Sequence, residues 1–295
     1  MNKKNYLERL TRIDRAKELL EESRKRKLSD NEISELKTLH TGYGGIYGKY
    51  SNDQFFTPDI VTSFMADILQ LNDNDKVLEF SCGTGNIINA LENKNKTLNI
   101  TGVELMREYA DIASLCYPKA NIINGDALEY LDRFENSFDI VIGNPPFGLN
   151  IEKSGFNIAK RKSEEYFLEM AVRCLKEGGY GMLVLPDGIL SNSTYKKLRE
   201  WLISQTYYLS SISLPSETFY FTGTSVNTSI VYFRKKIKGY EPGNYNIFMA
   251  ICDDIGWDRR GNETGKCDLN LIKETYLKER DMSVLIDIPN LKNVI

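Results

Sequence analysis

The chain has 295 residues and a net charge of −3, and 41% of its residues are hydrophobic and 27% charged, as is typical of a globular protein. No apolar run approaches the ~18 residues that span a bilayer, and the charged N-terminus lacks the apolar segment of a signal peptide, so we expect a cytoplasmic protein. One histidine, His40, and five cysteines without a CxxC pair argue against a metal site and against catalysis by histidine.

Residues 1–40 are predicted to form a short helical segment. Leucine and isoleucine at positions 7, 10, 13, 19 and 20 give a loose helical stripe among charged residues, and Ser29 or Asp30 can cap a second helix. Residues 40–58, rich in glycine and tyrosine, predict a loop, and residues 59–71 predict a helix after Pro58.

From residue 76 onward, strands and helices alternate. The predicted strands are 76–80, 99–105, 120–126, 138–144, 180–186, 209–215 and 225–236, with helices at 86–94, 107–117, 163–179 and 193–205. This alternation predicts an α/β fold with a doubly wound, mostly parallel, seven-stranded Rossmann-like sheet. We expect a catalytic domain at 41–238. Residues 239–295, with a strand at 245–251 and a helix at 268–280, are expected to be a C-terminal extension packed on it.

The stretch FDIVIGNPPFG, residues 138–148, ends a buried strand in an unusual group of residues. Asn144 offers a side-chain carbonyl, Pro145 and Pro146 offer carbonyl acceptors but no N–H donor, and Phe147 offers a flat apolar face. Such a group can accept hydrogen bonds from an amine on a planar ring, such as a nucleobase. A strand followed by a proline-stiffened turn without a function also explains the same residues. The residues at the ends of the other strands therefore decide between the two interpretations.

The first strand leads into the glycine turn SCGTGN, residues 81–86. Gly83 and Gly85 allow a strand-to-helix turn to pass closely beneath a ligand. Ile88 stands where the dinucleotide-binding fingerprint has its third glycine, which argues against NAD or FAD.

Three acidic residues end the first three strands of the series. Glu104 lies about twenty residues beyond the glycine turn, where an acid can bind two ribose hydroxyls. Asp126 is suited to accept from an adenine amino group, although it can equally cap a helix, and Glu79 lies where an ammonium could be bound. A ligand with adenine, ribose and a zwitterionic tail but no pyrophosphate fits this set, and S-adenosylmethionine is such a ligand.

Several motifs, in this order and spacing, resemble those of the adenine-N6 DNA methyltransferases. They are FFTP (55–58), VLEFSCGTGNI (77–87), GVEL (102–105), NGDAL (124–128) and GNPPF (143–147). Residues 181–203, 210–236 and 247–263 are similar to the modification subunits of type I restriction systems. Glu79-Phe80-Ser81 departs from the usual Asp-Pro-small pattern but keeps the carboxylate, and the N-terminal region is shorter than the helical domain of those subunits.

The resemblance implies S-adenosylmethionine as cofactor and DNA, with a flipped adenine as target, as substrate. It assigns catalysis to Asn144, Pro145, Pro146 and Phe147. It assigns cofactor binding to Phe56, Thr57, Glu79, Ser81, Gly83, Gly85, Asn86, Glu104, Leu105, Asp126, Ala127 and Asn144. The role of Thr57, at the methionine end of the cofactor, follows from the resemblance alone.

Three other functions are weighed against this interpretation. Methylation of the cytosine ring would use a cysteine in a Pro-Cys pair, and the chain has no such pair. A protein glutamine-N5 methyltransferase would suit the same Asn-Pro-Pro-aromatic motif, and a non-catalytic accessory subunit could keep the fold alone. Both of these remain alternatives to the adenine methyltransferase.

Target choice is expected to require a specificity subunit or another partner chain. The acidic charge balance gives no long-range attraction to DNA, and only Lys160–Lys162 and Arg234–Lys238 are basic clusters that can meet phosphates. We therefore expect weak DNA binding by the chain alone. The N-terminal helices are either a docking surface for the partner or a cap packed on the sheet.

Overall fold

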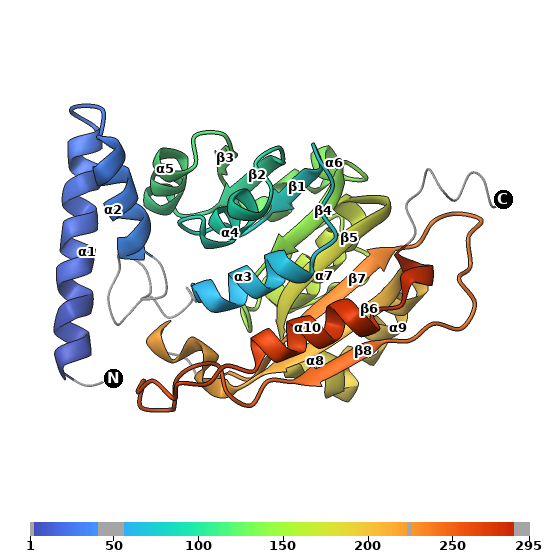
Figure 1. Ribbon diagram of the computed structural model, residues 1–295. Coiled ribbons are helices and arrows are strands. Elements are labelled where there is room, and N and C mark those ends of the chain that lie inside the picture. The colour runs from blue at the N-terminus through green and yellow to red at the C-terminus, as the bar shows by residue number, and fades with distance from the viewer. Residues whose placement is uncertain (1–2, 41–55, 223–225, 286–295) are drawn as a thin grey trace.

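A computed structural model describes residues 3–40, 56–222 and 226–285, and its strands form one eight-stranded sheet (Figure 1). The order across the sheet is β3-β2-β1-β4-β5-β7-β6-β8. The strands are β1 (Lys76–Glu79), β2 (Asn99–Glu104), β3 (Asn121–Asn124), β4 (Phe138–Gly143), β5 (Leu175–Pro186), β6 (Thr206–Leu214), β7 (Thr228–Lys235) and β8 (Phe248–Ile251).

All neighbouring strands pair in parallel except β7, which runs antiparallel to both β5 and β6. The predicted α/β, doubly wound, mostly parallel fold is confirmed. From β1 the chain moves outward to β2 and β3 and then returns to β4 on the other side of β1. The topological switch point therefore lies between β1 and β4, and open α/β sheets bind ligands outside the carboxyl ends of the strands at such a point.

The predicted count of seven strands is wrong, because β8 pairs with β6 as an eighth strand. The sequence predicts a strand at 245–251, but assigns it to a C-terminal extension packed on the catalytic domain. Phe248 and Ala250 pack against the core, whereas Met249 and Ile251 are exposed. This alternation is typical of an edge strand that is covered on one face only.

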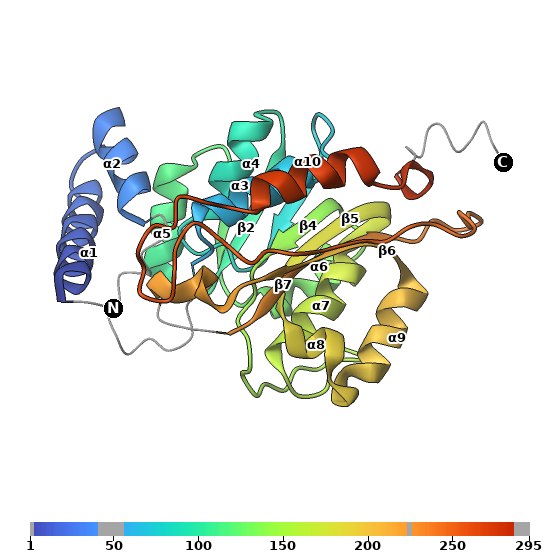
Figure 2. The same ribbon diagram turned by 60° about the horizontal axis from the view of Figure 1, so that its bottom comes forward.

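Helices cover both faces of the sheet. They are α1 (Lys3–Ser23), α2 (Asp30–His40), α3 (Asp59–Ile68), α4 (Asn86–Lys94), α5 (Arg107–Cys116), α6 (Leu131–Phe134), α7 (Ser163–Cys174), α8 (Asp187–Ser191), α9 (Lys196–Gln205) and α10 (Leu269–Glu279). Short 3-10 helices are η1 (Ala127–Tyr130), η2 (Ser193–Tyr195), η3 (Ser216–Thr222) and η4 (Met282–Val284). One apolar core joins the sheet to α3, α4, α5 and α10, and a second joins its other face to α6, α7, α8 and α9 (Figure 2).

Helix α7 ends earlier than the sequence predicts. The predicted helix extends to residue 179, but the chain becomes extended at Leu175, which pairs with Phe138 of β4. A register shift follows between Phe138 and Ile140, and Gly178 adopts a left-handed φ of 76°. The glycines therefore belong to an irregularity at the start of β5 and do not terminate the helix.

The N-terminal helices form a hairpin that lies against α5 (Figure 1). Leu19 and Leu36 are fully buried, and the Lys37 ammonium lies 4.5 Å from the centre of the Tyr117 ring. Ser29 caps α2 as predicted, because its Oγ accepts the Glu32 N–H at 3.3 Å while Glu32 accepts the Ser29 N–H at 2.8 Å. The helices therefore pack on the catalytic domain through α5. Their use as a docking surface for a partner stays a prediction.

Among the described residues, no helix combines the length and apolar character needed to cross a bilayer.

Candidate active site

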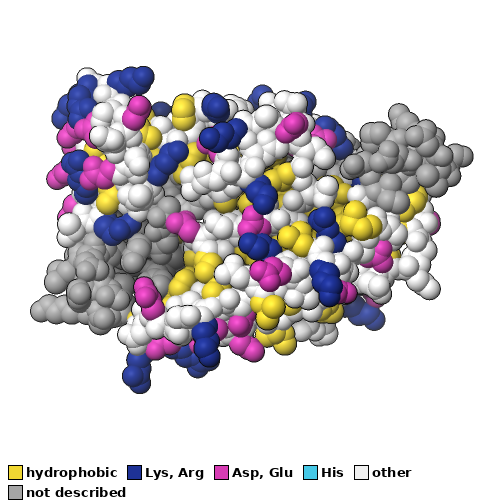
Figure 3. All heavy atoms as spheres, in the orientation of Figure 1, with side chains coloured by type: hydrophobic (Ala, Val, Ile, Leu, Met, Phe, Trp, Pro, Cys, Tyr) yellow, Lys and Arg dark blue, Asp and Glu magenta, His cyan; other side chains and the backbone are white. Residues whose placement is uncertain are grey.

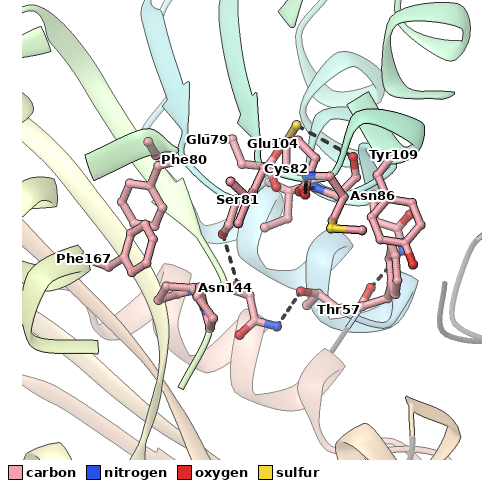
Figure 4. Close-up of a pocket in the computed structure, with 18 of the residues that line it drawn as sticks. Thr57, Glu79, Phe80, Ser81, Cys82, Asn86, Glu104, Tyr109, Asn144 and Phe167 are labelled. Atoms are coloured by element: carbon pink, nitrogen blue, oxygen red, sulfur yellow. Dashed lines mark hydrogen bonds between the residues drawn. The ribbon is translucent and has the colours of Figure 1, made fainter. Parts of the chain in front are cut away.

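A cavity of about 330 Å³ opens at the carboxyl ends of β1, β2 and β4 (Figure 4). Its size falls within the range of small-molecule sites, ~300–1,000 Å³. All of the site residues assigned from the sequence line it, except Gly85 and Phe147. The strand order thus brings together residues that are up to ninety positions apart in the chain.

Gly85 lies in the turn beneath the cavity and does not contact it. Gly83 and Gly85 both adopt left-handed conformations, with φ of 54° and 95°. A Cβ on Gly85 would lie 2.4 Å from the Tyr117 ring, so the turn needs glycine for both conformation and space. Gly83, in contrast, lines the cavity.

Glu104 holds the glycine turn through its carboxylate. Its Oε2 accepts the Gly83 N–H at 2.8 Å, and its Oε1 accepts the Met106 N–H at 2.7 Å. Burial raises the pKa of Glu104, and these backbone donors act against that rise. Each oxygen keeps a further lone pair with which it can accept a ligand hydroxyl.

Glu79 is the least compensated carboxyl in the cavity. It is 2% exposed, and its Oε2 has no hydrogen-bond partner among the described residues. Burial, and secondarily the neighbouring Glu104, raise the pKa of Glu79 well above its ordinary value. A buried carboxyl without a partner costs free energy, and a ligand cation would provide that partner. The cavity therefore fits a molecule with hydroxyls for Glu104 and a cationic group for Glu79, as S-adenosylmethionine has.

Asp126 is both a helix cap and a cavity residue. Its Oδ1 accepts the Leu128 N–H at 3.0 Å and thereby caps η1, while its Oδ2 pairs with the Lys153 ammonium at 2.7 Å. The capping alternative considered from the sequence is therefore correct, and the residue still lines the cavity.

Asn144 is held in one orientation by two residues from different segments (Figure 4). Its Nδ2 donates to Thr57 Oγ1 at 3.0 Å, and its backbone carbonyl accepts from Ser81 Oγ at 3.2 Å. Asn86 Nδ2 in turn donates to the Thr57 carbonyl at 3.1 Å. With its nitrogen bound to Thr57, the Asn144 carboxamide presents its oxygen as an acceptor on the other side.

Phe147 lies outside the cavity. Its side chain is half-buried and packs against the core on the α3 side of the sheet. Pro145 and Pro146 line the cavity. Stacking of a base on Phe147 stays a prediction.

Part of the apolar wall of the cavity was not identified from the sequence, namely Phe80, Tyr109, Leu149 and Phe167. The Phe80 and Phe167 rings lie 5.0 Å apart, and Tyr109 packs edge-on against Phe56 at 5.4 Å. Apolar and aromatic surfaces of this kind suit the faces of a planar heterocycle. Leu149 adds a wall residue from the segment after the NPPF motif.

This strand order, with a cavity at the switch point and an acid after each of the first strands, defines a Rossmann-like methyltransferase fold. The family model of the N-6 DNA methylases matches residues 45–292, and the chain belongs to this family.

Individual relatives agree with this assignment. The chain is 32% identical over 204 residues to the defense against restriction protein B of Escherichia phage P1, covering 66% of this chain and 9% of that protein. It is 32% identical over 163 residues to the modification methylase CviBIII of Paramecium bursaria Chlorella virus NC1A, covering 51% and 42%. The fold matches the type I restriction-modification methyltransferase subunit of Streptococcus thermophilus with a TM-score of 0.66 at 19% identity, covering 84% and 57%. The chain thus spans less than half the length of both sequence relatives.

Proposed function

We propose that this chain transfers the methyl group of S-adenosylmethionine to the N6 amine of adenine in DNA. The observation that carries the proposal is the orientation of Asn144. Thr57 Oγ1 accepts a carboxamide N–H at 3.0 Å, so the nitrogen faces Thr57 and the oxygen, an acceptor, lies on the other side of a residue that lines the cavity. Membership of the N-6 DNA methylase family supports DNA as the substrate class.

The cavity residues would hold the cofactor at both ends. Glu104 would accept the two ribose hydroxyls, Asp126 would lie at the adenine amine, and Glu79 would pair with the ammonium of the methionine portion. When bound, the cofactor supplies a methyl group that its sulfonium already activates. Binding and orientation are therefore the tasks left to the protein.

At the target, Asn144 and Pro145 act as acceptors. The adenine amine is a poor nucleophile because its lone pair is delocalised into the ring. The Asn144 Oδ1 and the Pro145 carbonyl would accept its two N–H groups and favour a nitrogen whose lone pair is directed at the methyl group. The base must leave the duplex to reach this place.

Target choice would come from a specificity subunit or another partner chain. On the face shown in Figure 3, lysine and arginine side chains are interspersed with acidic ones, and the net charge is −3. A uniform attraction to DNA is therefore not expected. The Streptococcus thermophilus relative is itself described as a subunit. Sequence-specific binding at low nanomolar Kd by the chain alone at physiological salt would contradict this part of the proposal.

The proposal is tested with cofactor carrying a labelled methyl group. The chain is incubated with DNA in one reaction and with a glutamine-containing peptide in another. Label in the DNA alone supports the proposal. Label in the peptide alone would support the glutamine-N5 alternative. Cofactor binding without transfer to either substrate, with the natural partner chain also present, would indicate an accessory subunit.

A further inference from the structure

The two basic clusters of the chain have different structural surroundings. Arg234 is 2% exposed, and its guanidinium donates to the carbonyls of Gly178 at 2.8 Å and Val284 at 2.9 Å. The Lys235 ammonium donates to the Leu175 carbonyl at 2.7 Å. Strand β7 runs antiparallel to β5, so its carboxyl end lies beside the amino end of β5. These residues are therefore at the end of the strands that faces away from the cavity. Arg234 and Lys235 therefore stabilise the fold, and the end of β7 that carries them is not placed to meet DNA at the site.

The other cluster, Lys160–Lys162, lies beside the cavity. It closes the loop 148–162, which follows the NPPF motif directly. Ile151 N–H donates to the Arg161 carbonyl at 2.9 Å, and the Lys162 ammonium donates to the Gly148 carbonyl at 2.8 Å. These bonds bring the basic residues next to Leu149, which lines the cavity.

A buried carboxylate fixes the middle of this loop. Glu169 of α7 is fully buried and accepts the backbone N–H groups of Asn157, Ile158 and Ala159 at 2.7, 2.8 and 2.8 Å. Burying a carboxylate is costly unless donors satisfy it, and here the loop backbone supplies those donors. The loop is therefore irregular but held in one conformation.

Two further carboxylates of α7 fix its ends. Glu165 accepts the Lys160 N–H at 2.8 Å, and Glu164 accepts the Gly148 N–H at 2.8 Å. Both glutamates are buried. The backbone of the basic residues is thus directed inward to α7, while the Lys160 and Arg161 side chains are exposed.

The exposed cations are available for a ligand. Within the part of the chain that the structure describes, Lys160 and Arg161 form no salt bridge, and the Arg161 Nε donates only to the Asn150 side chain at 3.2 Å. Irregular loops longer than ~12 residues are uncommon unless they carry function. A loop already held in one conformation loses little entropy when it binds.

We propose that loop 148–162 is a phosphate clamp, in which Lys160 and Arg161 bind the DNA phosphates beside the target adenine. This inference rests on the proposed function and adds to it the contact that places the duplex over the cavity. Phosphate contacts position DNA without reading its sequence. The clamp is therefore compatible with target choice by a partner chain.

The test compares two double variants that each remove two positive charges. Lys160→Ala/Arg161→Ala alters the clamp. Lys96→Ala/Lys119→Ala is the control and alters two exposed lysines. They precede β2 and β3 and so lie at the amino ends of the parallel strands, away from the cavity. Binding of a fluorescent duplex is followed by anisotropy over about 20 to 150 mM salt, where phosphate contacts dominate affinity. Cofactor affinity is measured alongside.

We expect the clamp variant to bind DNA about tenfold more weakly and its log–log salt dependence to fall by about 2, as two phosphate contacts are lost. The control variant and the cofactor Kd should not change. Equal DNA binding by the two double variants would overturn the clamp. The charge-preserving variant Lys160→Arg/Arg161→Lys must keep most of the affinity, and a loss as large as that of the alanine variant would also overturn it.

The outcome is separable from the proposed function. Failure of the wild-type chain to methylate DNA, even with its natural partner chain added, would contradict the function, while the binding comparison would still decide the clamp. Methylation of DNA by a clamp variant with unchanged DNA affinity would contradict the clamp alone.

Discussion

Asn144 donates its side-chain amide hydrogen to Thr57 Oγ1 across 3.0 Å, and so joins the NPPF motif to the FFTP motif. Thr57 is 5% exposed. The resemblance to the adenine methyltransferases assigned Thr57 to the methionine end of the cofactor. The structure shows in addition that its hydroxyl orients the carboxamide that would receive the target amine.

The Thr57 hydroxyl should therefore matter for the rate of transfer. We expect Thr57→Val to lower kcat about 10- to 100-fold, because the carboxamide loses the partner that fixes its orientation. Thr57→Ser keeps the hydroxyl and should restore most of the rate. An unchanged kcat in the valine variant, measured by transfer of labelled methyl groups at saturating cofactor, would contradict the orienting role. A weaker cofactor Kd would report the role at the methionine end.

Glu104 should control cofactor affinity. We expect Glu104→Gln to weaken S-adenosylmethionine binding about 10- to 100-fold, because charge-assisted hydrogen bonds to the ribose become neutral ones. Titration calorimetry measures the change, and Glu200→Gln on the exposed face of α9 serves as the control. If both variants bind the cofactor as the wild type does, the assignment of the ribose to Glu104 is wrong.

Glu79 should make the ligand-free protein less stable as the pH rises. Its pKa is raised in the folded state, so the folded protein favours the protonated form. The unfolded chain ionises near pH 4.5, and above that pH the folded state pays an increasing penalty. We expect Glu79→Gln to raise the Tm of the ligand-free protein at pH 8, with little effect near pH 4. A lower Tm in the variant at pH 8 would show that the Glu79 carboxylate is stabilised in the ligand-free protein, contrary to this prediction.

The same carboxyl predicts proton release when the cofactor binds. A cation beside Glu79 favours its ionised form, so binding lowers the pKa of Glu79 and releases a proton. Calorimetry in two buffers of different ionisation enthalpy should detect this proton in the wild type and not in Glu79→Gln. Identical heats in both buffers for the wild type would be inconsistent with a cation at this position.

The glycine turn offers a test of fold stability that is independent of activity. Gly85→Ala would place a Cβ 2.4 Å from the Tyr117 ring at a φ of 95°. Gly239 has a similar φ of 79° but open space around it. We expect Gly239→Ala to cost ~1–2 kcal/mol of unfolding free energy for conformation alone, and Gly85→Ala to cost more. Equal costs in urea denaturation would show that the turn moves away from Tyr117 freely.

The polar half of the candidate site could be predicted from the sequence because strand geometry determines it. In a parallel sheet the residues after neighbouring strands meet at one edge, and this places Glu79, Glu104, Asp126 and Asn144 together. The apolar half could not be predicted in the same way. Tyr109 lies on an apolar helical face, and such a pattern is the same whether the side chain lines a cavity or fills the core.

The buried glutamates that hold loop 148–162 could not be predicted from the sequence either. Glu164, Glu165 and Glu169 resemble the charged face of an exposed helix, yet they are buried because the loop backbone satisfies them. The clusters at 160–162 and 234–238 are both strongly basic in the sequence. The antiparallel direction of β7 carries the second cluster to the end of the strands away from the cavity, where Arg234 is buried. The first cluster stays beside the cavity.

The most direct test of the account is mass spectrometry of nucleosides from DNA incubated with the chain and methyl-labelled cofactor. The wild-type chain should produce labelled N6-methyladenine, with its natural partner chain added if the chain alone is inactive. Asn144→Ala should produce almost none while its cofactor Kd stays within about twofold, since the lost acceptor acts on the target amine and not on the bound cofactor. Label on another atom or base, or N6-methyladenine formed by Asn144→Ala at the wild-type rate, would contradict the assignment of the reaction to this site.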